Sequence, residues 1–407
     1  MFKNIKNDFP MFKNVKEMQG NRFVYLDNAA TTFKPYSVIE AGDSYCNFYN
    51  ANSHRGDYDI ANVVDKTVAE TRKRCADFIN AEAREIVFTS GASMSINTIA
   101  YGFASKILKN NDEILVTEAE HASNLLPFIR FSDYGVNLNY IELDKEGRLT
   151  PENVEKAITP KTKMICIAHV TNVLGYVADI KKICEIAHKH GIFVAVDGAQ
   201  SVPHMKIDVK DLDCDFLSFS CHKMCGPTGL GILYGKYELL EQMDPLMTGG
   251  GMNVKFGLCG EVKYLDPPER FEAGTLNLEG IFAFNETLKY LSNIGMENIE
   301  KREKELRKYA ISRLSENPNI IIYNKNAESG IISFNYKGVF AQDEATYLNS
   351  KGICVRSGQH CAKLLDDFLE TPATIRASIY FYNDESDVDS LVEALKTGGD
   401  YLDAYFN

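Results

Sequence analysis

Between residues 85 and 235, short apolar runs alternate with stretches of helical period, and this alternation most constrains the fold. Runs without polar alternation are typical of parallel strands that are buried on both faces, and the stretches between them supply the covering helices. The apolar runs are 85–91, 112–118, 136–143, 163–170, 192–200, 215–220 and 230–235. Three intervening segments, 97–108, 150–158 and 179–190, are predicted helices, and the third ends at a stop signal, Gly191. The pattern predicts an α/β chain with a mainly parallel seven-stranded sheet covered by helices.

The pattern changes after this region. Glycine and proline interrupt 249–280, which predicts a long irregular loop, and the charged segment 286–316 predicts one long helix. A second, smaller α/β unit follows. We expect a large domain over 25–290 and a small C-terminal domain over 291–407. The first 24 residues, in which Met-Phe-Lys-Asn occurs twice around Pro10, should form two short turns that pack with the small domain.

Charge and cysteine usage exclude several classes of function. The formal net charge of −12 disfavours binding to nucleic acid or to an anionic membrane surface. The 10 cysteines show no paired spacing, which is typical of reduced thiols rather than of a disulfide framework. The charged N-terminus lacks the apolar segment of a signal peptide, and no apolar run approaches the length of a membrane span. A soluble cytoplasmic protein is expected.

Polar residues follow three of the predicted strands, at the edge where an open α/β sheet binds its ligands. Gly91-Ala92-Ser93 opens a helix, where free backbone N–H groups can hold a phosphate. Asp197 follows a buried strand and could pair with a protonated ring nitrogen. Lys223 follows another buried strand, so desolvation could make its amine nucleophilic, and the adjacent Ser220 and His222 could donate to a phosphate.

Each of these features has a simpler structural reading. The glycine turn could serve only the bend, Asp197 could cap the next helix, and most lysines are exposed loop residues. A phosphate cradle, an acid for a pyridinium and a lysine for an aldehyde are together what pyridoxal 5′-phosphate (PLP) requires. Their convergence on one sheet edge favours a PLP enzyme, with Lys223 as its Schiff-base lysine.

Two further residues could take part in catalysis. His121, which also follows a strand, could stack on an aromatic cofactor and move protons, although it could equally be a satisfied loop histidine. Cys361 lies between Arg356 and Ala362, beside His360, in a loop that contains Gly358. Its thiol could therefore be exposed and have a depressed pKa, whereas other cysteines fit better as small core residues. Cys221, His222 and Cys225 form an incomplete set for zinc, so no metal is predicted.

The chain resembles the group II cysteine desulfurases, within the class V branch of fold-type-I PLP enzymes, and most closely the desulfurase of the Suf iron–sulfur assembly pathway. The resemblance covers residues 25–382 in family order. It rests on the segments YLDNAATT (25–32), HASNLLPF (121–128), VTNVLG (170–175), VDGAQSVPH (196–204), FLSFSCHK (216–223), GPTGLGILYGK (226–236), RFEAGTLN (270–277), RSGQHCA (356–362) and TIRAS (374–378).

The resemblance implies a role for each matching position. Lys223 would hold the cofactor aldehyde and His121 would stack on its ring, while Asp197 would pair with the ring nitrogen and Gln200 with the phenolic oxygen. Ala92, Ser93, Ser220 and His222 would bind the phosphate, with Thr275 reaching it from the other subunit of a homodimer. Arg376 would grip the substrate carboxylate, assisted by Asn172; His54 and Arg356 would line the substrate pocket, and Cys361 would take the sulfur.

The implied reaction converts L-cysteine to L-alanine and leaves a persulfide on Cys361, for delivery to a small Suf-type acceptor protein and on to iron–sulfur clusters. A selenocysteine lyase or cysteine-sulfinate desulfinase on the same scaffold is the nearest alternative. An aminotransferase or epimerase is more distant, and a non-catalytic scaffold protein more distant still.

Overall fold

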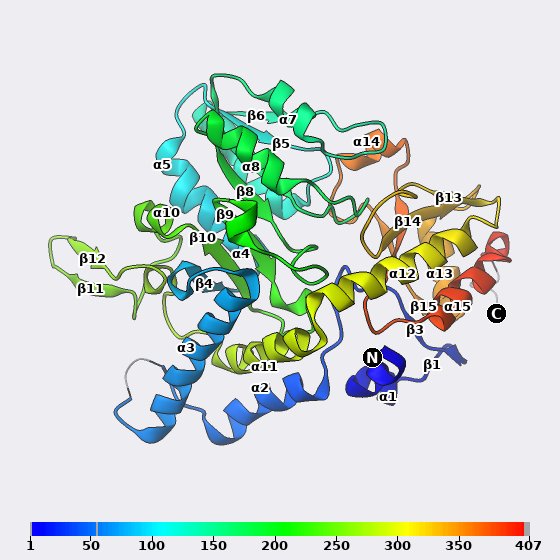
Figure 1. Cartoon of the computed structure of the whole chain (residues 1–407), viewed down its shortest axis with the longest axis horizontal. Helices are drawn as coiled ribbons and strands as arrows, with labels where there is room; N and C mark the ends of the chain where they lie inside the picture. The colour runs from blue at the N-terminus through cyan, green and yellow to red at the C-terminus, as the bar shows by residue number, and fades with distance from the viewer. Residues whose placement is uncertain (1, 54–55, 403–407) are drawn as a thin grey trace.

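The computed structural model describes residues 2–53 and 56–402, and its centre is a seven-stranded sheet (Figure 1). The spatial order is β4 (Ile86–Thr89), β10 (Gly231–Gly235), β9 (Phe216–Ser220), β8 (Phe193–Asp197), β7 (Thr162–Ala168), β5 (Glu113–Val116) and β6 (Asn137–Tyr140). Strand β10 is antiparallel to both of its neighbours, and every other pairing is parallel. The predicted mainly parallel seven-stranded sheet is confirmed.

Helices cover both faces of this sheet because successive strand residues point in opposite directions. Leu115 of β5 packs in one core with α3 (Asp59–Ile79), α8 (Ile180–Lys189) and α11 (Leu278–Ile294). Its neighbours Ile114 and Val116 pack in a second core, with α4 (Ala92–Ile99), α6 (Leu126–Ile129) and α10 (Tyr237–Gln242). Strands apolar on both faces, as the sequence indicated, are thus buried from both sides.

A smaller antiparallel sheet follows in the chain, in the order β13 (Ile320–Ile322), β14 (Ile331–Tyr336), β17 (Thr374–Ser378) and β16 (Arg356–Gly358). Its core includes residues of α12 (Met296–Leu314), α13 (Ala341–Ser350) and α15 (Glu385–Leu395). Strand β15 (Ile353–Cys354) pairs in parallel with β3 (Val24–Tyr25), which brings the start of the chain beside this unit. The domain boundaries given above remain a prediction.

The N-terminal segment forms η1 (Phe2–Asp8) and α1 (Pro10–Asn14), the two short turns expected around Pro10, and then the hairpin β1 (Glu17–Met18) and β2 (Asn21–Arg22). Phe9 is buried, and its ring lies 4.8 Å from that of Tyr382. Lys6 forms an ion pair of 2.8 Å with Asp387. Aromatic packing and charge therefore join this segment to the chain near α15.

Two predictions about the middle of the chain are wrong. The single helix over 286–316 is two helices, α11 and α12, which meet at Gly295. Gly295 has φ +85°, a left-handed conformation that ends a helix and that glycine adopts without steric cost. The stretch 249–280, expected to be irregular, contains a hairpin of β11 (Asn253–Phe256) and β12 (Val262–Tyr264), which projects from the main body at the left of Figure 1.

The remaining elements are short connections, except for α2. They are α2 (Tyr36–Phe48), η2 (Ala83–Glu85), the π-helical η3 (Ala100–Ala104), α5 (Ser105–Ile107), η4 (Ala122–Asn124), η5 (Arg130–Tyr134), α7 (Pro151–Ala157), α9 (Val209–Leu212), η6 (Cys221–Lys223), η7 (Glu269–Phe271), α14 (Leu365–Leu369) and η8 (Gly398–Asp400). Across the described part of the chain, every helix is too short or too polar to span a bilayer.

Candidate active site

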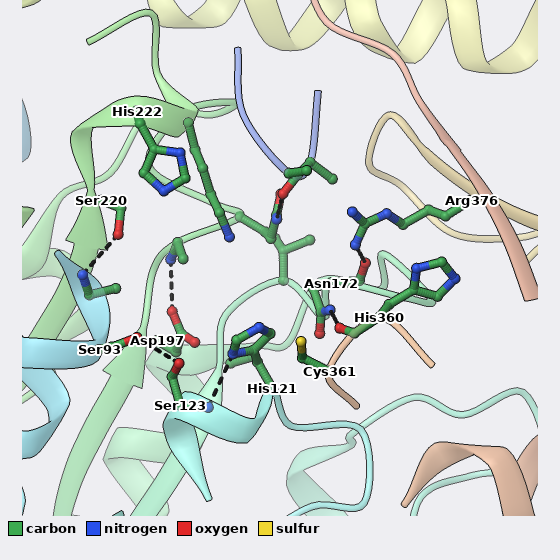
Figure 2. Close-up of a pocket in the computed structure, with 18 of the residues that line it drawn as sticks. Ser93, His121, Ser123, Asn172, Asp197, Ser220, His222, His360, Cys361 and Arg376 are labelled. Carbon is green, nitrogen blue, oxygen red and sulfur yellow. Dashed lines mark hydrogen bonds between the residues drawn. The ribbon is translucent and has the colours of Figure 1, made fainter. Parts of the chain in front are cut away.

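A cavity of about 320 Å³ lies at the carboxyl ends of β7 and β8 and is closed on one side by the loop after β16. It is lined by Ala29, Ala30, Ala92, Ser93, His121, Ser123, Ala168, Val170, Asn172, Asp197, Ala199, Gln200, Ser220, His222, Lys223, Arg356, His360, Cys361 and Arg376. Figure 2 shows Ser220 and His222 on one side of this cavity, Arg376 and His360 on the other, and Cys361 between His121 and Asn172. The residues predicted from separate strand ends thus share one pocket.

The turn between β4 and α4 forms one end of the cavity. Gly91 has φ +155°, and the backbone of this turn lies so close to β10 that a Cβ on Gly231 would be 2.3 Å from the Gly91 Cα. Ala92 N–H donates to Ser220 Oγ at 2.8 Å, and the hydroxyls of Ser93 and Ser123 are 2.7 Å apart. The helix N-terminus and three hydroxyls give this end the donors that a phosphate needs.

Asp197, the last residue of β8, places a buried carboxylate in the cavity. Its Oδ1 accepts the N–H of Ala199 at 2.9 Å (Figure 2). This bond orients the side chain, and no residue of 2–53 and 56–402 donates a hydrogen bond to the second oxygen, Oδ2. A carboxylate held in this way can keep a heterocyclic nitrogen protonated.

Lys223 follows β9 on the short turn η6 and also lines the cavity. Thr32 fixes this turn, since its backbone N–H and its hydroxyl both donate to the carbonyl of His222, at 3.0 and 3.1 Å. Burial lowers the pKa of Lys223 to about 8, against an opposing effect of Asp197. Burial and the nearby Lys223 also lower the pKa of His222 to about 4, so that imidazole is neutral.

His121 lies at the start of η4. Its Nδ1 accepts the N–H of Ser123 at 3.1 Å, so the neutral ring carries its proton on Nε2. Burial, and then the charge of Lys223, lower the pKa of His121. The next residue, Ala122, donates its N–H to the carbonyl of Cys361 at 2.7 Å and so ties the histidine to the cysteine loop.

Cys361 is exposed at the cavity wall, as predicted. His360 and Cys361 both have left-handed backbones, φ +49° and +59°, which are uncommon for residues other than glycine. Asn172 Nδ2 donates to the carbonyl of His360 at 2.7 Å and holds the loop in place. The His360 ring is buried against Thr374, and burial lowers its pKa to about 3, so it adds no positive charge beside the thiol.

Two arginines face each other at the small-sheet side of the site. Arg376 of β17 is buried, and its Nη1 donates to the carbonyl of Asn172 at 2.8 Å. Arg356 of β16, half-exposed, donates through Nη2 to Asp27 at 2.9 Å. Asp27 belongs to the segment YLDNAATT, but the resemblance gave it no role at the site. The sequence signal that could have indicated one is a single acidic residue before a run of small side chains, directly after β3.

Two predicted residues are not placed at the site. His54 lies outside the described residues. Thr275 is exposed and is not part of the cavity wall of this single chain, so its predicted contact from a second subunit remains a prediction.

Several buried polar atoms at the cavity suit a polar ligand. The Gln200 amide donates to the carbonyl of Ala29 at 2.7 Å, but within residues 2–53 and 56–402 its Oε1 has no hydrogen-bond partner. In the same range, Asn172 Oδ1 and Arg376 Nε are also buried without a partner. Such atoms are costly unless a ligand or water satisfies them. A phosphate cradle, a carboxylate and a desolvated amine in one cavity are the set that fits PLP.

A mainly parallel α/β sheet with a lysine and a carboxylate at its strand ends is the arrangement expected of a PLP-dependent enzyme. The chain belongs to the class V aminotransferase family, whose model matches residues 24–391. Its relatives include a probable cysteine desulfurase of Halalkalibacterium halodurans, 43% identical over 99% of both chains.

Solved structures agree with this assignment. The chain is similar to the cysteine desulfurase of Thermococcus onnurineus, with TM-score 0.91 and 37% identity over 97% of both chains. It is also similar to the cysteine desulfurase CsdA of Escherichia coli, with TM-score 0.90 and 33% identity over 98% of both.

Proposed function

We propose that this protein is a PLP-dependent cysteine desulfurase, which converts L-cysteine to L-alanine and transfers the sulfur to Cys361. The observation that carries the proposal is that Lys223 and Cys361 line the same cavity, although they follow strands of different sheets. The similarity to named cysteine desulfurases over nearly the whole chain supports it.

The residues at the β4–α4 turn, with Ser220 and His222, would hold the cofactor phosphate. Asp197 would pair with the ring nitrogen, Gln200 with the phenolic oxygen, and His121 with the ring face. When bound, PLP would supply an electron sink that stabilises negative charge at the substrate Cα.

The chain itself would bind the substrate and move its protons. The buried guanidinium of Arg376 is the natural ligand for the α-carboxylate, and Asn172 fixes its orientation. Because the pKa of Lys223 is about 8, about a tenth of its amine is unprotonated at pH 7, far more than for an ordinary lysine, and can accept the Cα proton. His121 holds a second proton on Nε2 at the cavity wall.

Cys361 would carry out the sulfur step. Its thiolate attacks the substrate Sγ, the Cβ–Sγ bond breaks, and its electron pair remains with the carbon, which is then protonated. Cysteine and one protein thiol thus give alanine and one protein persulfide, with no external oxidant or reductant. An exposed sulfur on a loop held by Ala122 and Asn172 can face both substrate and acceptor.

The finer assignments rest on the resemblance. We propose a homodimer in which Thr275 contributes to the phosphate site of the other subunit. We also propose a cytoplasmic, Suf-type role, in which a small acceptor protein takes the sulfur for iron–sulfur cluster assembly.

The test is to incubate the PLP-loaded protein with L-cysteine, quantify alanine, and locate the persulfide by peptide mass spectrometry. Cys361→Ala should abolish the persulfide and reduce alanine formation by about a hundredfold or more. Cys259→Ala, which removes another exposed thiol, is the matched control and should keep both. Undiminished alanine formation by Cys361→Ala would contradict the sulfur step, and faster turnover of selenocysteine or cysteine sulfinate would favour the alternative activities.

A further inference from the structure

Two cations are placed directly opposite each other in the small sheet. Arg356 of β16 and Arg376 of β17 are register partners in an antiparallel pair, where side chains on one face lie close together. Like charges in such positions repel each other. Both are wall residues of the cavity, so their charges also determine what the cavity can bind.

Asp27 lies against both guanidinium groups, but it does not hold them equally. Arg356 makes three hydrogen bonds to it, from Nε to both carboxylate oxygens at 3.2 Å and from Nη2 to one of them at 2.9 Å. Arg376 reaches it only at 3.6 Å. Asp27 therefore pairs with the Nε–Nη2 edge of Arg356 and neutralises its charge, although it uses only two of the five guanidinium N–H groups.

Arg376 is left with unused capacity. Its Nη1 donates to the carbonyl of Asn172, while its Nε has no partner among residues 2–53 and 56–402 and is fully buried. The three side chains together carry a net charge of +1, enough for one carboxylate. A second acidic group on the same ligand would find no further positive charge to pair with among Asp27, Arg356 and Arg376.

We propose that Asp27 determines the charge specificity of the site. By holding Arg356, it leaves one guanidinium for the substrate, and so selects amino acids with one acidic group over those with a second acid on the side chain. The inference rests on the proposed function, in that an amino acid occupies this cavity. Asp27 is a positioning residue, because it acts through Arg356.

The alternative is that Asp27 only neutralises the repulsion between the two arginines and stabilises the fold. A purely structural role would lower stability, and activity toward all substrates, in proportion. The specificity role changes the ratio between two substrates that share an α-carboxylate and differ in side-chain charge. Cysteine and cysteine sulfinate form such a pair, because only the sulfinate carries a second acidic group on its side chain. Desulfination of cysteine sulfinate with water gives alanine and sulfite, so alanine formation measures turnover of both substrates.

The experiment compares kcat/KM for cysteine sulfinate and for cysteine in the PLP-loaded protein and in Asp27→Asn. The ratio should rise about tenfold, the effect of one charge-assisted hydrogen bond from a half-exposed guanidinium. Asp27→Glu, which keeps the carboxylate, should retain the original ratio, and Asp27→Asn/Arg356→Gln should lose the gain. If Asp27→Asn does not fold, Asp27→Ser removes the same charge with a smaller side chain and should change the ratio in the same direction.

A binding measurement separates this inference from the proposed function. Calorimetric titration with alanine and with aspartate reports the same charge preference without any desulfuration, and Asp27→Asn should favour aspartate. If the native protein produces no alanine from cysteine but this shift occurs, the desulfurase proposal fails and the role of Asp27 stands. A folded Asp27→Asn protein with unchanged ratios in both assays would overturn the role of Asp27.

Discussion

At the scale of single residues, the site depends on what burial does to charged groups. Removal of water disfavours a cation, so the pKa of Lys223 falls to about 8, while the opposite charge of Asp197 limits the change. The same effect keeps His222 and His360 neutral, with pKa values of about 4 and 3. The cations that act on the Lys223 amine are therefore Arg376 and Arg356, which lower its pKa further, while these two imidazoles add no charge.

The Lys223 amine should show this pKa directly in the PLP-free protein. Acylating reagents attack only the neutral amine, so labelling of Lys223 should rise with pH and reach half its maximum near pH 8. Competitive labelling with acetic anhydride, followed by peptide mass spectrometry, measures this midpoint.

Asp197→Asn serves as the matched comparison, because it removes the charge that raises the pKa of Lys223 and should move the midpoint to lower pH. A midpoint above pH 10 in the native protein, close to that of an ordinary lysine, would contradict the desolvated site.

At the scale of elements, the phosphate end of the cavity depends on close approach of two backbones. Strand β10 runs antiparallel to β4, and Gly231 is paired with Thr89 just before the turn at Gly91. Any side chain at position 231 would overlap the backbone of that turn. The N-terminus of α4 therefore has its position because one residue of a neighbouring strand has no Cβ.

Gly231→Ala should weaken PLP binding by about tenfold or more, because the added methyl would lie 2.3 Å from the Gly91 Cα and the turn must move. Titration of the PLP-free protein with PLP, followed by absorbance, gives the affinity. Gly42→Ala in α2 is the control, since its Cβ would meet other atoms at an ordinary 3.6 Å. Equal PLP affinities for the two variants would show that the close approach does not matter.

At the scale of the whole molecule, the site is assembled from distant parts of the chain. The cysteine loop lies between strands β16 and β17 of the small sheet, yet its carbonyls accept hydrogen bonds from Ala122 and from Asn172 of the large-sheet region. The turn after β3 adds Asp27, which reaches both arginines. Thr275 is exposed in the single chain and is available for contact with a second copy.

The proposed dimer predicts complementation between two defective variants. Lys223→Ala lacks the amine, and Thr275→Val lacks the hydroxyl proposed to act across the interface. If each site takes Thr275 from the other subunit, mixed dimers contain one complete site, and random mixing should restore about a quarter of native activity. Alanine formation after the variants are unfolded and refolded together measures this recovery, with each variant refolded alone as the control. A site that uses its own Thr275 would show no recovery.

The sequence by itself determined the parallel sheet, because its strands are apolar on both faces and the pattern is local. It also determined Lys223, Asp197 and the β4–α4 turn as one site, since carboxyl ends of neighbouring parallel strands meet at one edge. The break at Gly295 and the hairpin after residue 252 were missed, because a charged helical pattern continues across a glycine and exposed strands lack an apolar signature.

The tertiary structure alone decided how the small sheet completes the site. Asp27 lies 329 residues from Arg356 in the chain, and no local pattern gives the partner of a charge at that separation. Neither could the sequence show that His360 faces Thr374 instead of supporting the thiol with positive charge. The neutral state of His360 follows from burial by residues that only the folded chain brings together.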